Sequence, residues 1–289
     1  MASFIMPDMN LGRQIERESH SAATMCWTCG SCDFECPVNI ATNRLRPQKI
    51  VRMANLGLLE DLLHMPEIWY CLTCRRCMNV CPNVVSPSTL IAFVRHNALF
   101  KGIVSMDTFR RYHALFTKFQ RVRWHAVNHC FNKEFENFTD QMWHDWLEQP
   151  VGPLTSSIAP KKSDRIDKDV RAMMASSRSL ACFTCGECSS ACPIVCERSV
   201  FDPRVLFRMI NLGMVDELMR SPSIWLCIDC GRCTKSCSQL VDGRQLINQV
   251  KELATLWGVL DIDFNLRLEH ANQIIYNYFL TEIDQLFGL

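Results

Sequence analysis

Cysteines occur in this chain in four runs of one spacing. Sixteen of the 18 cysteines in the 289-residue sequence follow the pattern Cys-x2-Cys-x2-Cys-x3-Cys. This spacing is typical of cysteine-ligated iron-sulfur clusters of the bacterial ferredoxin type. Four complete runs therefore predict four 4Fe-4S clusters, which exchange single electrons. The runs are Cys26, Cys29, Cys32, Cys36; Cys71, Cys74, Cys77, Cys81; Cys182, Cys185, Cys188, Cys192; and Cys227, Cys230, Cys233, Cys237.

The fourth cysteine of each run is predicted to serve the neighbouring cluster. In two-cluster ferredoxins the last cysteine of a run, often followed by proline, ligates the other cluster, so that two runs interlock. The list of sixteen ligands does not depend on this rule, but the grouping does. The predicted sets are Cys26, Cys29, Cys32 and Cys81 for cluster 1; Cys71, Cys74, Cys77 and Cys36 for cluster 2; Cys182, Cys185, Cys188 and Cys237 for cluster 3; and Cys227, Cys230, Cys233 and Cys192 for cluster 4.

Disulfides and structural zinc are the two alternative uses of so many cysteines. The N-terminal residues include no basic segment followed by an apolar core and a cleavage site, so nothing directs the chain to an oxidising compartment. Zinc is usually held by pairs of Cys-x2-Cys, and it needs only four ligands. A third cysteine two residues further on, present in every run, favours a cluster over zinc.

The chain is an internal duplication with a constant offset of 156 positions. Cys26 corresponds to Cys182, Pro47 to Pro203, and Arg76 to Arg232, without a gap. We therefore expect residues 1–102 and 166–258 to form two equivalent two-cluster modules. Residues 103–165 would form a helical connector and linker, and residues 259–289 a helical tail.

The segments between cysteine runs favour helices over strands. Asp202-Pro203 opens an apolar-periodic stretch that ends at Gly213, and residues 47–57 repeat the pattern. A second short helix is expected from Ser221-Pro222. Aromatic residues at helical spacing predict long helices within 103–149, and the tail places apolar residues on one helical face. The predicted fold is mainly α, with two tandem α-helical ferredoxin modules joined by a helical connector.

Composition narrows the class of protein further. The net charge of +1 provides no basic excess for nucleic acid. No apolar stretch approaches the roughly 20 residues of a transmembrane helix. We expect a cytoplasmic protein without a transmembrane segment.

Several residues depart from the repeated pattern or flank it. Ser238 replaces the proline that follows the fourth cysteine elsewhere, which would loosen that loop. Cys196 and Cys130 lie outside the runs. Cys196 is interpreted as a non-ligand and Cys130 as a buried inert thiol.

Cations within the runs would either favour the reduced clusters or simply face solvent. Aromatic residues beside the ligands are expected to pack in the core. The cations are Arg75, Arg76, Arg232 and Lys235, and the aromatic residues are Trp27, Trp69, Phe183 and Trp225.

The cysteine runs and their flanking residues resemble the iron-sulfur C subunit of heterodisulfide reductase. The resemblance covers about residues 10–102 and again 166–258, as if two such subunits were fused. It implies an α-helical ferredoxin module with two 4Fe-4S clusters that relays electrons between a flavin subunit and a catalytic subunit. The segments that carry it are Cys26-Trp27-Thr28-Cys29-Gly30, Trp69-Tyr70-Cys71-Leu72-Thr73-Cys74 and Cys77-Met78-Asn79-Val80-Cys81-Pro82.

The sequence contains no recognisable catalytic residues of its own. It has no Gly-x-Gly-x-x-Gly turn for a dinucleotide and no adjacent Cys-Cys pair. We therefore expect a non-catalytic electron-transfer subunit of a heterodisulfide-reductase-like complex from an anaerobic or sulfur-metabolising organism. Its partners would be a flavoprotein and a cysteine-rich catalytic subunit. Two alternatives are the iron-sulfur subunit of another dehydrogenase or hydrogenase complex and a zinc-stabilised scaffold.

Overall fold

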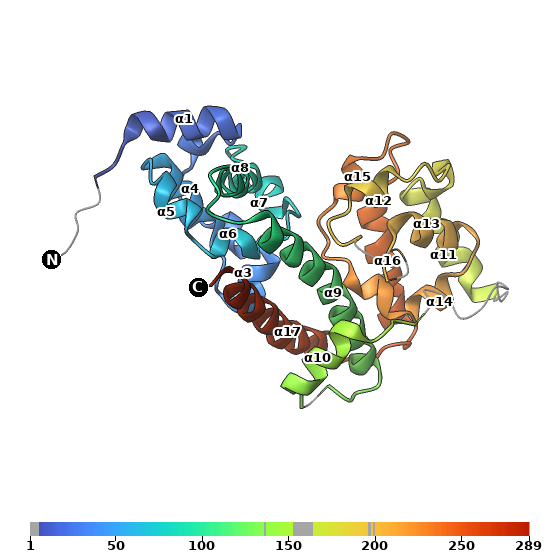
Figure 1. Ribbon diagram of the computed structural model, residues 1–289. Helices are drawn as coiled ribbons and strands as arrows, with labels where there is room; N and C mark the ends of the chain where they lie inside the picture. The colour runs from blue at the N-terminus through green and yellow to red at the C-terminus, as the bar shows by residue number, and fades with distance from the viewer. Residues whose placement is uncertain (1–5, 136, 153–163, 196–197, 199, 289) are drawn as a thin grey trace. The chain divides into compact units, whose positions relative to one another are not determined.

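The computed structural model describes residues 6–135, 137–152, 164–195, 198 and 200–288. These residues form helices and turns and include no β-strand (Figure 1). The predicted mainly-α fold, with two helical ferredoxin modules joined by long helices, is confirmed. The chain divides into two compact units. The first contains the residues up to Ala114 and those from Tyr276 onward, and the second contains Leu115–Ile275.

Short helices dominate the first unit. They are α1 (Met9–Ser19), the 3-10 helix η1 (Ala23–Met25), α2 (Ser31–Phe34), α3 (Pro37–Thr42), α4 (Pro47–Asn55), α5 (Leu59–Leu63), α6 (Glu67–Tyr70), α7 (Arg76–Asn79) and α8 (Pro87–Phe100), with the first part of α9 (Met106–Phe131) and the last part of α17 (Phe264–Phe287).

The core of the first unit forms where α1, α4, α5 and α8 pack together. Ile50, Leu62 and Leu90 are almost completely buried there. Gly12 permits the close approach of α1 to α4, because a Cβ at this position would lie 2.5 Å from the carbonyl oxygen of Asn55. The short helices α2 and α7, which carry cysteines of two different runs, pack against each other at one end of this core.

The C-terminal end of α17 completes the first unit. The Phe287 ring stacks on Trp69 with a centroid distance of 4.5 Å. Asp284 forms an ion pair with Arg44 and accepts a hydrogen bond from the Tyr70 hydroxyl. The predicted tail helix is therefore packed against α6, immediately before Cys71.

The second unit repeats the short helices of the first and adds most of the connector. Its elements are the remaining parts of α9 and α17 with α10 (Asp140–Glu148), α11 (Asp164–Ser176), η2 (Ser179–Ala181), α12 (Glu187–Ala191), α13 (Pro203–Asn211), α14 (Val215–Met219), η3 (Pro222–Leu226), α15 (Arg232–Lys235) and α16 (Gly243–Leu256).

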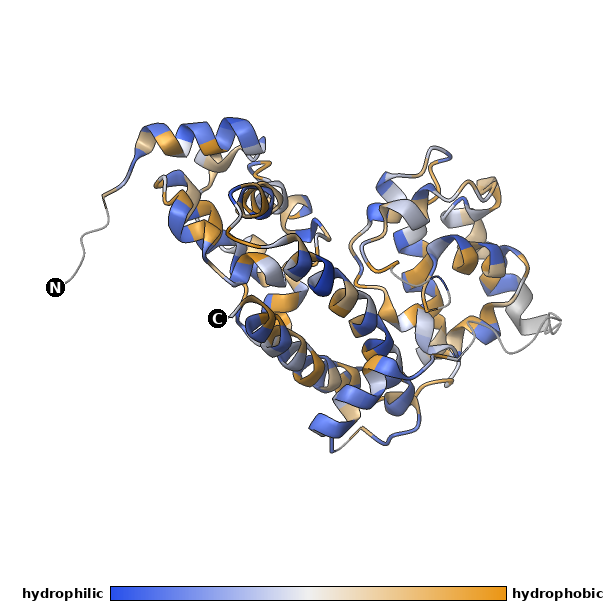
Figure 2. Cartoon of the chain, viewed as in Figure 1, coloured by the Kyte–Doolittle hydropathy of each residue, from blue (hydrophilic) through white to orange (hydrophobic). Residues whose placement is uncertain are grey.

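In the second unit, α13, α14 and α16 form the core. Leu206, Leu218 and Leu246 are completely buried. Figure 2 shows hydrophobic and hydrophilic residues on the same helices, as expected when each helix buries one face. The connector contributes aromatic residues to the interior, and Trp143 and Phe119 are almost completely buried.

The predicted helices between the cysteine runs are also confirmed. Helices α4 and α13 begin at Pro47 and Pro203. Proline suits the first position of a helix, because a backbone N–H there would have no partner within the helix. Asp202 caps α13 by accepting a hydrogen bond from the Arg204 N–H, 2.9 Å away. The segment after Ser221 is a 3-10 helix. The predicted domain boundaries stay a prediction, and residues 153–163 of the expected linker lie outside the described residues.

Candidate metal centres

Two hollows in the first module are each lined by four cysteines. Cys26, Cys29, Cys32 and Cys81 line one hollow of about 350 Å³, which we call the outer site. Cys36, Cys71, Cys74 and Cys77 line the second, of about 330 Å³, which we call the inner site. Cys29 is exposed, whereas all four cysteines of the inner site are buried. In both hollows the fourth cysteine comes from the other run.

The second module contains an equivalent inner site. Cys192, Cys227, Cys230 and Cys233 line a hollow of about 350 Å³. The remaining four cysteines, Cys182, Cys185, Cys188 and Cys237, are the predicted outer set of this module. Two contacts tie this set together: α12, which carries Cys188, packs against α15, and the N–H of Ser238 lies 3.4 Å from a carboxylate oxygen of Glu187. A proline, as in the other three runs, could not donate this hydrogen bond.

The cysteine loops present backbone N–H groups to the sulfur atoms. The residue before the second cysteine has a left-handed conformation in all four loops, with φ values of 55–61°. The N–H of Thr28 lies 3.4 Å from Cys26 Sγ, and the N–H of Thr73 lies 3.4 Å from Cys71 Sγ. Alternation of right- and left-handed residues turns N–H groups into a concavity that binds anions, including iron-sulfur clusters. The residues at these positions are Thr28, Thr73, Thr184 and Asp229.

Burial controls the protonation of the thiols. It raises the pKa of Cys36 and of Cys192 to about 12, and that of Cys188 to about 11. By contrast, hydrogen bonding from Ser31 lowers the pKa of the exposed Cys29. Buried thiols bind metal only as thiolates, so loading of these sites must release protons.

The donor set and the backbone at these sites fit a cysteine-ligated cluster. Each hollow combines four sulfur ligands with inward N–H groups, and its lining is otherwise mostly apolar. Within the ranges that the structure describes, no three His, Cys, Asp or Glu side chains are arranged to hold a single metal ion. Cys196 lies outside the described residues. Cys130 is completely buried, and burial raises its pKa to about 11, as expected for an inert thiol.

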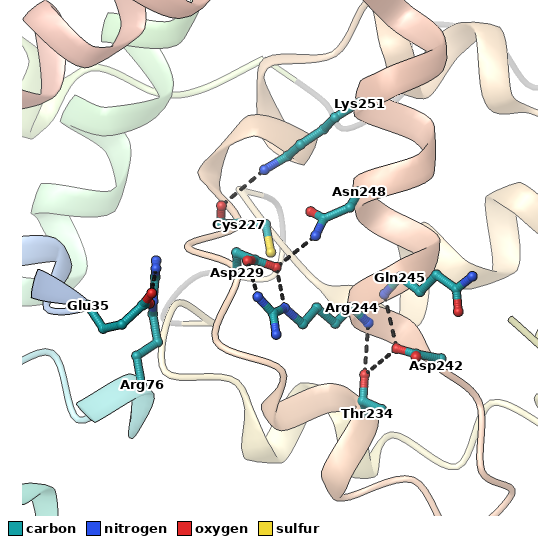
Figure 3. A network of polar contacts seen from close by, with 10 residues as sticks. All are labelled: Glu35, Arg76, Cys227, Asp229, Thr234, Asp242, Arg244, Gln245, Asn248 and Lys251. Carbon is teal, nitrogen blue, oxygen red and sulfur yellow. Dashed lines mark hydrogen bonds and ion pairs between the residues drawn. The ribbon is translucent and has the colours of Figure 1, made fainter. Parts of the chain in front are cut away.

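Polar side chains hold the inner loop of the second module in place (Figure 3). Asp229 accepts hydrogen bonds from Arg244 Nε at 2.7 Å and from Asn248 Nδ2 at 2.8 Å. Asp242 accepts from the Thr234 hydroxyl at 2.9 Å and caps α16. In the first module, Arg76 Nε donates to Glu35 at 3.1 Å. These contacts connect one cysteine run to the next helix or to the other run.

Sequence reasoning missed the charges that lie behind the cysteine loops. Arg95 in α8 donates to the carbonyl oxygen of Cys71 at 2.7 Å, and Lys251 in α16 donates to that of Cys227 at 3.1 Å. The two residues are separated by the repeat offset of 156 positions. A basic residue at corresponding positions of both halves was the signal that could have revealed them.

The expectation that all four flanking aromatic residues pack in the core is wrong for two of them. Trp69 and Trp225 are buried, but Trp27 is 74% and Phe183 60% exposed. They precede the second cysteine of the two outer sets by two residues, and these outer loops lie at the surface. Cys29 and Cys185 are exposed in the same loops.

Comparison with protein families finds a 4Fe-4S dicluster domain in each half of the chain. The 4Fe-4S dicluster domain family matches residues 22–85 and again 178–241. The chain is similar to the C subunits of heterodisulfide reductases, and the resemblance noted from the residues is confirmed. No helix in the described parts of the chain combines the length and the apolar character that crossing a membrane requires.

Three relatives illustrate this similarity. The C subunit of the H(2):CoB-CoM heterodisulfide,ferredoxin reductase of Methanothermobacter thermautotrophicus is 29% identical over 34% of this chain and 52% of the relative. An iron-sulfur C subunit of the CoB-CoM heterodisulfide reductase of Methanocaldococcus jannaschii is 37% identical over 28% of this chain and 42% of the relative. A C-type subunit of the H(2)/formate:CoB-CoM heterodisulfide,ferredoxin reductase of Methanococcus maripaludis is 32% identical over 34% of this chain and 53% of the relative. The matched segments span about half of these relatives.

Proposed function

We propose that this chain is an electron-transfer subunit of a heterodisulfide-reductase-like complex. It relays single electrons through four 4Fe-4S clusters between a flavin subunit and a catalytic subunit. The observation that carries the proposal is the grouping of cysteines from two runs around one hollow, seen three times. The similarity to the C subunits of heterodisulfide reductases supports the kind of complex. The cytoplasmic location stays a prediction.

The protein would hold the clusters through the four predicted ligand sets. Clusters bound there would accept and release one electron at a time. The thiolates of Cys26, Cys29, Cys32 and Cys81 would hold the first, and N–H groups such as that of Thr28 would stabilise sulfur charge. Buried residues around the inner site, including Leu72 and Ile91, would exclude water. The exposed loop at Cys29 would leave one cluster of this module accessible to a partner.

Metal analysis of the anaerobically purified chain tests this proposal. About sixteen iron and sixteen sulfide per chain are expected from four clusters of four iron each. EPR during stepwise reduction should then show several cubane signals. As a control, Cys130→Ser should leave iron content unchanged, because this thiol lies outside every ligand set. Colourless protein that contains zinc, or about half of the expected iron, would contradict the proposal.

Co-purification from the native organism tests the partners. A flavoprotein and a cysteine-rich catalytic subunit should accompany the chain. Recovery with a molybdenum or nickel enzyme instead would assign the chain to another dehydrogenase or hydrogenase complex.

A further inference from the structure

We propose that each module places a cation beside its inner site and a carboxylate beside its outer site, and that these charges bring the reduction potentials of its two clusters closer together. This inference rests on the proposed function, because it requires clusters in both sites. The proposal rests on one observation. Both halves of the chain place a basic residue beside the inner site and a carboxylate beside the outer site, although the residues differ between the halves.

Arg95 is the cation of the first module. Its Nε donates to the carbonyl oxygen of Ile68 and its Nη2 to that of Cys71, both at 2.7 Å. The guanidinium carbon lies 5.3 Å from the centre of the Trp69 ring, within the range of a cation–π interaction. The charge is thus fixed against the backbone of the first ligand of the inner site.

Lys251 occupies the corresponding position in the second module. Its Nζ donates to the carbonyl oxygen of Cys227 at 3.1 Å (Figure 3). The same Nζ lies 5.5 Å from the Trp225 ring centre. Arg123 adds a second cation by donating to the carbonyl oxygen of Leu226 at 2.9 Å. In both halves a basic side chain therefore contacts the carbonyl oxygen of the first cysteine of the inner site. Burial lowers the pKa of Lys251, whereas the nearby Cys227 and Asp229 favour its charged form.

The outer sites instead have a carboxylate nearby. Asp33 lies 3.8 Å from Cys32 Sγ and accepts a hydrogen bond from the Gln48 N–H, at the start of α4, at 2.8 Å. The second module has Ser189 at the equivalent position. There the completely buried Asp202, at the start of α13, accepts a hydrogen bond from the Ser189 hydroxyl, beside Cys188.

Other charged groups near the sites do not reverse this pattern. Asp229 and Arg244 both line the inner site of the second module, but they form an ion pair and largely cancel. Arg75 lines the inner site of the first module and adds positive charge. At the second outer site, Arg204 lies 3.8 Å from Asp202 and weakens its charge, whereas Glu187 adds a carboxylate.

These charges act against the effect of burial. Reduction adds negative charge to a cluster, so a nearby cation raises its potential and a carboxylate lowers it. Burial disfavours the added charge, which lowers the potential of the inner cluster relative to the exposed outer cluster. The cation and the carboxylate oppose this difference in each module. Electrons can therefore move between the two sites in either direction without a large step in potential.

Charge-removing variants of the full chain test the inference, with potentials measured by EPR-monitored redox titration. Arg95→Gln should lower the reduction potential of the inner cluster of the first module, and Lys251→Gln that of the inner cluster of the second module. Asp33→Asn should raise a third. The conservative variants Arg95→Lys and Lys251→Arg should stay close to the parent values. Arg13→Gln removes an exposed charge from α1 as a matched control and should shift nothing.

The outcomes separate this inference from the proposed function. Absence of clusters in the parent chain would defeat the proposed function itself. Four clusters with potentials unmoved by Arg95→Gln and Lys251→Gln, or raised by them, would overturn the inference alone. Should Arg95→Gln fail to assemble its cluster, Lys251→Gln and Asp33→Asn decide, and unchanged potentials in both would overturn it.

Discussion

Arg75 is the residue at which the two halves differ most clearly in backbone strain. It follows the second cysteine of its run and has a left-handed conformation, with φ of 65°. The other three runs have glycine there, at Gly30, Gly186 and Gly231, all with positive φ. A residue with a Cβ is less stable in this conformation by roughly 1–2 kcal/mol. Arg75 therefore carries strain that its counterparts avoid.

Replacing Arg75 with glycine should relieve this strain. We expect Arg75→Gly to raise the free energy of unfolding of the first module by about 1 kcal/mol, since greater freedom of the unfolded chain offsets part of the gain. Anaerobic denaturant unfolding measures the change. The reciprocal variant Gly231→Arg should destabilise the second module. A loss of stability in Arg75→Gly would mean that the arginine makes contacts worth more than the strain.

At the residue scale, the sequence predicts ligands better than it predicts their surroundings. Cysteine spacing is local, so the sixteen candidates could be named without a structure. Arg95 lies 24 residues after Cys71, and its contact with that carbonyl depends on how α8 packs. The exposure of Trp27 likewise depends on the position of its loop at the surface rather than on its neighbours in sequence.

At the scale of elements, the contact of α17 with α6 joins residues that are far apart in the sequence. Phe287 stacks on Trp69, and Asp284 contacts Arg44 and Tyr70. Tyr70 directly precedes Cys71, so the helix end supports the backbone that enters the inner loop. Aromatic stacking of this kind adds to the stability that burial alone provides.

Loss of the Phe287 ring should therefore weaken the first module. Phe287→Ala is expected to lower its free energy of unfolding by about 1–2 kcal/mol, less than for a completely buried phenylalanine because Phe287 is only partly buried. Unfolding followed through Trp fluorescence measures this. Gln285→Ala, on an exposed position of the same helix, is the matched control. Equal effects of the two variants would argue against a role of the stacking.

Helices α4 and α13 could be predicted because their start and stop signals are local. Proline opens both, and glycine follows soon after both end. The sequence predicts that the tail is a helix with one apolar face. It does not predict which surface that face covers. Apolar periodicity indicates that a face is buried, and not which distant residues bury it.

At the scale of the whole molecule, the two modules should load their clusters independently. Each proposed ligand set takes its cysteines from one module only, although from two runs. We therefore expect Cys81→Ala to abolish the same EPR signal as Cys29→Ala, and Cys36→Ala the same signal as Cys74→Ala. Iron should fall by about four per chain in each case. If Cys81→Ala instead matched Cys74→Ala, the fourth ligand would belong to its own run. Loss of iron from the second module as well would contradict independence.

The outer-site carboxylate has changed its place in the chain between the two halves. It comes from the cysteine-bearing helix as Asp33 in one half and from the next helix as Asp202 in the other. When the two repeats are aligned, Asp33 corresponds to Ser189 and Arg46 corresponds to Asp202, and the alignment alone suggests two unrelated differences. In three dimensions the two differences belong together, because the carboxylate lost at one position is restored from the other. Searches for determinants of redox behaviour in duplicated proteins should therefore compare charges in space as well as residues in register.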